Sequence, residues 1–142
     1  MIKYKRGKFT VEWFAKPASI AMSANTFAAY NAAGAMTFAT ATSTEIKGLI
    51  MRTITSADDD YASTTDIPVL VPDEDTVFEF SGEAHNCTAA MNGEFVDITD
   101  ADTINGGANS LEVIKVLKYI DATTMLFTIP KKSGVAASTN AD

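Results

Sequence analysis

His85 and Cys87 are the residues of this chain whose types and spacing could do nucleophilic chemistry. The chain has one His and one Cys, and on a strand their spacing places both on one face. In contact, the imidazole could activate the thiol as a catalytic dyad. A single His and a single Cys near a turn are more often structural, and a zinc site needs more nitrogen or sulfur ligands than this pair supplies. We therefore predict no catalytic residue, no metal and no cofactor.

Three carboxylates suggest a second kind of chemistry, the binding of a hard cation. Asp97, Asp100 and Asp102 resemble the beginning of a calcium loop. The register of an EF-hand fails, because Ile104 stands where the third ligand should be and Leu111 stands where the closing Glu should be. A looser cation site at residues 97 to 102 stays open, since calcium accepts irregular cages of oxygen atoms.

The charges of the chain are divided between two regions. Residues 53 to 114 contain 14 acidic residues and no Lys or Arg, and the formal net charge is −7 with a pI near 4.6. The acidic body would repel nucleic acid, so we expect no nucleic-acid partner. Four basic residues fall within the first eight positions, namely Lys3, Lys5, Arg6 and Lys8. This polarity suits a protein that docks on a charged surface or on copies of itself.

Residues 1 to 16 combine these basic residues with aromatic ones and predict an N-terminal docking arm. An aromatic side chain among charges commonly anchors in a neighbour's pocket. Whether these aromatic residues belong to the core or to an interface is left open. Deleting residues 1 to 10 should leave the fold intact and weaken docking. The candidate interface with a docking partner or with other copies of the chain consists of Lys3, Tyr4, Lys5, Arg6, Lys8, Phe9, Trp13 and Phe14.

The rest of the chain predicts one β-rich domain over residues 17 to 130, followed by a flexible tail over residues 131 to 142. Its first part, residues 17 to 44, is rich in Ala and uncharged. These small side chains lose little entropy on ordering and suit a repeated interface. The segment is too polar for a membrane-spanning helix, and Glu12 and Lys16 interrupt any signal peptide. We expect no membrane partner and no small-molecule substrate.

Alternating apolar residues predict several short strands. Residues 124 to 129 and 111 to 120 form an expected hairpin, with the latter strand buried on both faces. Pro68 and Pro72 bracket residues 69 to 71, which suggests an edge strand. Further strands are expected at residues 46 to 54, 76 to 80 and 94 to 98. The pattern predicts a mainly β fold, a small antiparallel β-barrel or β-sandwich with an extended N-terminal arm.

Four segments resemble the capsid decoration proteins of tailed bacteriophages, also called cement or head-stabilising proteins. They read VEWFAKPASIAM (residues 11 to 22), TATSTEIKGLIMRTITSADDDYASTTDIPVLVP (40 to 72), AAMNGEFVDITDADTI (89 to 104) and VIKVLKYIDATTMLFTI (113 to 129). The resemblance lies in the order of the segments and covers most of residues 11 to 129.

The resemblance implies a non-enzymatic virion protein, made in the bacterial host cytoplasm. Such proteins bind the outer surface of the expanded head between major capsid protein subunits and stabilise it against internal pressure. The implied partners are the major capsid protein and other copies of this chain, as a homotrimer or a dimer. The arm role would fall on residues 1 to 14 by position. The alternative is another phage structural component, such as a tail-tube, head-completion or fibre-base protein.

Overall fold

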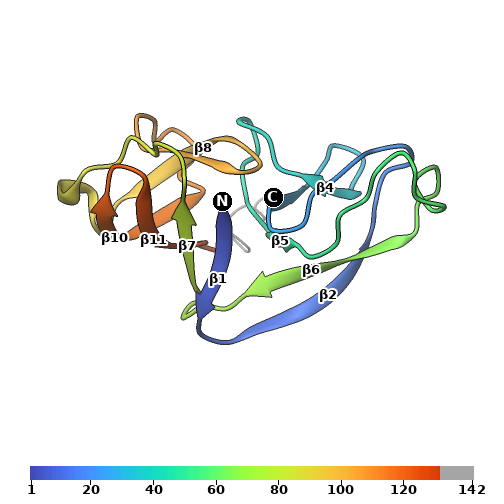
Figure 1. Ribbon diagram of the computed structural model, residues 1–142, viewed down its shortest axis with the longest axis horizontal. Coiled ribbons are helices and arrows are strands. Elements are labelled where there is room, and N and C mark those ends of the chain that lie inside the picture. The colour runs from blue at the N-terminus through green and yellow to red at the C-terminus, as the bar shows by residue number, and fades with distance from the viewer. Residues whose placement is uncertain (132–142) are drawn as a thin grey trace, which may run out of the picture.

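The protein is mainly β (Figure 1). The computed structural model describes residues 1 to 131. These residues form two antiparallel sheets and one short 3₁₀ helix, η1 (Ala89–Met91). In spatial order, one sheet consists of β1 (Ile2–Arg6), β7 (Val77–Ser81), β11 (Thr124–Thr128), β10 (Ile114–Asp121), β8 (Phe95–Asp100) and β9 (Thr103–Asn105). The other consists of β2 (Phe9–Ala15), β6 (Asp66–Pro72), β5 (Gly48–Ile50), β3 (Phe27–Tyr30) and β4 (Met36–Phe38). The two sheets are consistent with a sandwich, and they do not close into a barrel.

One long, bent pair of antiparallel strands connects the two sheets. β1 pairs with β7, and β2 pairs with β6, so residues 2 to 15 run alongside residues 66 to 81. Figure 1 shows β2 and β6 side by side and leading into β1 and β7. We call this pair the N-terminal ribbon. β1 is the edge strand of the six-stranded sheet and β2 is the edge strand of the five-stranded sheet. Residues 2 to 15 of the ribbon therefore form an edge of both sheets.

The ribbon bends at Gly7, and local chemistry requires the bend there. Gly7 has a φ of +99°, which side chains other than glycine rarely allow, and a Cβ at this position would collide with the backbone carbonyl of Asp75. Opposite the bend, the hydroxyl of Thr76 donates to the carbonyl of Lys8 and accepts the backbone N–H of Asp73 at 2.8 Å. These bonds hold the two halves of the ribbon at a fixed corner.

The main core lies between the two sheets. Phe78 and Phe127 stack with ring centroids 5.5 Å apart, and Phe27 from the other sheet meets Phe127 edge-on at 5.8 Å. Leu49 and Leu70 belong to the same buried cluster. A second cluster covers the opposite face of the five-stranded sheet and consists of Met22, Ala28, Met36, Ile50, Ile54, Ile67, Val69 and Val71. The central strands of this sheet are therefore buried on both faces.

The sequence predicted several strands correctly. The hairpin of β10 and β11 is present, and the strands at residues 77 to 81 and 95 to 100 lie close to their expected bounds. The edge strand predicted at residues 69 to 71 is wrong, because β6 lies between β2 and β5. Its prolines are tolerated because β5 pairs only with Val69 and Leu70, so Pro68 and Pro72 flank the paired segment.

Two further predictions need correction. The strand at residues 111 to 120 is not buried on both faces, since Leu117 and Ile120 are exposed at its far end. The extended N-terminal arm is also wrong, because β1 and β2 pair along their lengths with the body. Ile2 is buried in the main core, so removing residues 1 to 10 would take out a strand and a core side chain. The predicted tail at residues 131 to 142 lies outside the described residues except for Lys131.

Candidate interaction surface

The outer strand of the five-stranded sheet exposes a row of large apolar side chains. Phe9, Val11 and Trp13 share one face of β2, because residues two apart on a strand point the same way. All three are exposed, and Trp13, the one tryptophan of the chain, has 62% of its surface accessible. On its free side β2 has no strand neighbour among residues 1 to 131. An apolar, unpaired edge is a typical place for another chain to bind.

Tyr4 extends this row across the corner of the ribbon. Its ring meets Phe9 edge-on, with ring centroids 5.0 Å apart, and its hydroxyl donates to the carbonyl of Gly7 at 2.5 Å. Both rings remain exposed. The two predicted interface residues are thus brought together by the bend, although they lie on strands of different sheets.

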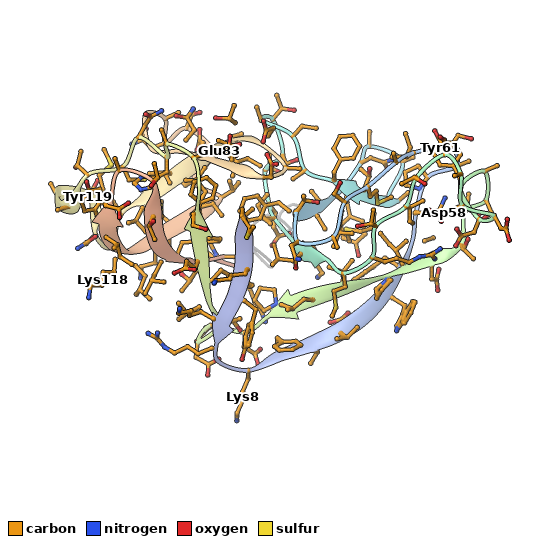
Figure 2. The ribbon with its side chains drawn as sticks, viewed as in Figure 1. Lys8, Asp58, Tyr61, Glu83, Lys118 and Tyr119 are labelled. Atoms are coloured by element: carbon orange, nitrogen blue, oxygen red, sulfur yellow. The ribbon has the colours of Figure 1, made fainter. Side chains whose placement is uncertain are left out.

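The basic residues of the predicted interface divide into two groups. Lys3 and Lys5 both contact the carboxylate of Glu79 on β7, at 3.1 and 3.8 Å. Arg6 and Lys8 form no ion pair with any residue from 1 to 131. Figure 2 shows Lys8 projecting from the corner of the ribbon, away from both sheets. Arg6 and Lys8 are therefore the unpaired cations at this corner, although Asp73, Glu74 and Asp75 line the same shallow pocket as Lys8.

Phe14 near the end of β2 and Lys16 just after it point into the protein, although Ala15 between them is exposed. Phe14 is half-buried and meets Tyr30 edge-on with ring centroids 5.8 Å apart, so it belongs with the core and not with the exposed row. Lys16 follows the strand and is fully buried. Its ammonium group donates to the carbonyls of Ser63 at 2.6 Å, Tyr61 at 2.9 Å and Pro17 at 3.3 Å. This basic residue fastens a loop and takes no part in the surface charge.

His85 and Cys87 do not form a dyad. The N–H of Cys87 donates to Nδ1 of His85 at 3.0 Å, so Nε2 carries the proton and donates to the carbonyl of Asp121 at 2.8 Å. Both ring nitrogens are thus used by the backbone, and the ring is fully buried. Burial raises the pKa of the Cys87 thiol to about 11, so it stays protonated at neutral pH. The His85 ring therefore joins the backbone of residues 85 to 87 to that of Asp121.

Asp97 also has a structural environment. Burial acts to raise the pKa of Asp97, but hydrogen bonds from Glu112, Leu111 and Ser110 outweigh it and hold the pKa below its usual range. The backbone N–H groups of Glu112 and Leu111 lie 2.8 and 2.9 Å from one carboxylate oxygen, and Ser110 donates twice to the other at 3.1 Å. Glu112 has a φ of +55°. Asp97 therefore fixes a strained turn.

Asp100 and Asp102 form a separate pair. The interaction between the two side chains lowers the pKa of Asp100 and raises the pKa of Asp102. They line an open cleft of about 470 Å³ together with Ser23 and Phe38. No group of three His, Cys, Asp or Glu within residues 1 to 131 is arranged to hold a metal ion. The loose cation site considered at residues 97 to 102 gains no support from this arrangement.

Comparison of the chain with protein-family models, with curated proteins and with solved structures gave no match. Among the described residues, no helix has the length and apolar character needed to cross a membrane. Of the expected interface residues, the structure places Tyr4, Phe9 and Trp13 along one exposed edge, and it removes Phe14 from that edge. Val11 was missed, although the alternation of Phe9, Val11 and Trp13 in the sequence could have found it.

Proposed function

We propose that this chain is a structural virion protein, a decoration protein that binds the outside of a phage head between major capsid protein subunits and stabilises it. The supporting sequence features are the four segments that resemble such proteins. The structural observation that carries the proposal is the corner of the N-terminal ribbon, where Arg6 and Lys8 are exposed beside Tyr4 and Phe9. A decoration protein works by contact and needs no catalytic group or cofactor.

The corner residues supply the kind of contact that a capsid surface can use. Arg6 and Lys8 are free to pair with acidic groups of the major capsid protein, because they form no ion pair within residues 1 to 131. The aromatic pair beside them adds apolar area, which contributes more to affinity than an exposed ion pair does. Many copies on one lattice would raise the effective affinity further.

Binding to heads tests the proposal directly. Expanded heads that lack the protein are mixed with the purified chain, and co-sedimentation and the temperature of head disruption are measured. We expect saturable binding and a higher disruption temperature. The double variant Arg6→Glu/Lys8→Glu should bind more weakly. Lys118→Glu is the matched control, since Lys118 is exposed on β10, far from Lys8 in Figure 2. Heads that bind no protein and are no more stable would contradict the proposal.

Copy number separates decoration from the alternative phage roles. A decoration protein approaches the abundance of the major capsid protein, whereas a completion or fibre-base protein occurs in about the number of a ring. Densitometry of a gel of intact virions measures this ratio. A band of ring stoichiometry would favour the alternative component.

A further inference from the structure

We propose that the free edge of β2 pairs with the β2 edge of a second copy, antiparallel and centred on Val11, to form a twofold dimer. The five-stranded sheets of the two copies would then continue as one sheet. This inference rests on the geometry of the edge and does not depend on the proposed function.

The edge is open, apolar and long enough for strand addition. β2 is 7 residues long and stands at the end of its sheet, and its side chains are exposed except for half-buried Phe14. Soluble proteins usually protect such an edge with charges, prolines or a covering segment, because its free N–H and C=O groups template another strand. β2 has one charged residue, Glu12, and no proline. A partner strand that covers the free edge of β2 would explain why this edge is so apolar.

The order of side chains on β2 is self-complementary about Val11. In an antiparallel pair centred there, Val11 faces Val11 of the partner copy, and each Phe9 faces a Trp13. Aromatic and β-branched pairs of this kind stabilise antiparallel strands. The opposite face places each Thr10 beside a Glu12, and these two side chains already hydrogen-bond within one copy at 3.3 Å. In this contact both copies use the same surface, related by a twofold axis, so the assembly stops at a dimer.

Neighbouring registers fit less well. A pair centred on Glu12 would place two carboxylates directly opposite each other, which is destabilising. A pair centred on Thr10 would place Trp13 opposite Gly7, at the bend, where the largest exposed side chain would have no side chain to contact. The register centred on Val11 is the one that matches apolar residues and avoids a like-charge pair.

The charges at the two ends of β2 also favour antiparallel pairing. Lys8 lies at one end, and Asp66 and the loop with Asp58 lie at the other (Figure 2). Antiparallel pairing brings the Lys8 end of each copy to the acidic end of the other. The Lys8 corner also carries Asp75, which accepts the N–H of Lys8 at 3.4 Å. The electrostatic contribution is therefore small, and the apolar match is the main source of affinity.

The dimer also divides the predicted interface residues between two tasks. Phe9, Val11 and Trp13 would be covered by the partner copy, whereas Arg6 and Lys8 would stay at the two ends of the shared strand pair. Antiparallel pairing separates the two corners, so each remains open to a different partner. Of the trimer and the dimer expected from the resemblance, a closed twofold edge favours the dimer.

Oligomeric state and register are both measurable on the full chain. Sedimentation velocity should give a species of about twice 15.1 kDa at high concentration, and Trp13 emission should shift to shorter wavelength as the dimer forms. Val11→Lys places two ammonium groups face to face and should leave a folded monomer. Ile120→Lys is the matched control, because Ile120 on β10 is 47% exposed and Val11 is 44% exposed. The control should remain dimeric, and circular dichroism checks that both variants fold.

Single cysteines then fix the register. On mild oxidation, Val11→Cys should give a disulfide-linked dimer in high yield, whereas Thr10→Cys and Glu12→Cys should not. Cys87 is buried, so the wild-type chain should form little disulfide-linked dimer and gives the background level of cross-linking. The proposal is overturned if the wild type is a monomer at every concentration, if Val11→Lys dimerises as well as the wild type, or if residue 10 or 12 cross-links better than residue 11. Loss of head binding in the Arg6→Glu/Lys8→Glu variant with the dimer intact would separate the two proposals.

Discussion

Val11 and Leu70 are direct cross-strand partners, yet 44% of Val11 and only 6% of Leu70 are exposed. Their strands, β2 and β6, have similar apolar content and pair with each other along their whole lengths. They differ in position, since β6 has neighbours on both edges and a core cluster on each face, whereas β2 has one neighbour. The comparison shows that burial of a strand is set by what lies around it more than by its own residues.

The largest expected effect comes from truncating the two partners separately. Leu70→Ala should cost about 3 kcal/mol of unfolding free energy, because it leaves a cavity between the sheets. Val11→Ala should change stability by less than about 0.5 kcal/mol at low protein concentration, where the proposed dimer is dissociated. Urea denaturation of both variants measures the difference. Equal losses in the two variants would show that β2 is packed within the monomer after all.

The same contrast explains which parts of the fold could be predicted from the sequence. The hairpin of β10 and β11 and the strand at β7 follow from local alternation and a short turn. The place of β6 does not, because its partners β2 and β5 come from distant parts of the chain and nothing local in residues 69 to 71 specifies them. The prolines that indicated an edge merely flank the paired segment.

The N-terminal residues illustrate the limit for the candidate surface. Their composition left open whether the aromatic side chains belong to the core or to an interface, and in the structure Tyr4, Phe9 and Trp13 are exposed. Composition could not reveal that these residues are strands of the body, because the pairing depends on the corner at Gly7 and on residues 66 to 81. It also could not separate Lys16 from the other basic residues, since burial of that ammonium depends on the distant carbonyls of Tyr61 and Ser63.

Lys16 gives the second prediction, since it marks the point where the exposed strand enters the protein. Lys16→Met keeps a long side chain but removes the donor to the carbonyls of Tyr61 and Ser63. We expect a loss of about 2 kcal/mol, because buried acceptors lose a charged partner. Lys8→Met, at the exposed end of the same strand, is the matched control and should have little effect. Thermal unfolding compares the two variants. A Lys16→Met variant as stable as Lys8→Met would show that the loop does not need the ammonium.

The smallest expected effect on stability comes from comparing a buried carboxylate, Asp97, with an exposed one, Glu12. Asp97 is buried and accepts hydrogen bonds from residues 110 to 112, whereas Glu12 is exposed on β2. The pKa of Asp97 is lower in the folded protein than its usual value, so its ionised form stabilises the fold above that usual value, near pH 4. This contribution, of about 1 kcal/mol, is lost as the pH falls through the folded pKa.

Asp97→Asn isolates this contribution, because Asn has no carboxyl to titrate. The unfolding free energies of the wild type and Asp97→Asn, measured in urea from neutral to acid pH, should converge as the pH falls. Glu12→Gln removes one negative charge from the exposed strand and reveals any effect of net charge alone. A wild-type advantage over Asp97→Asn that stays constant into strong acid would mean that shape, and not the charge of Asp97, holds the turn at Glu112.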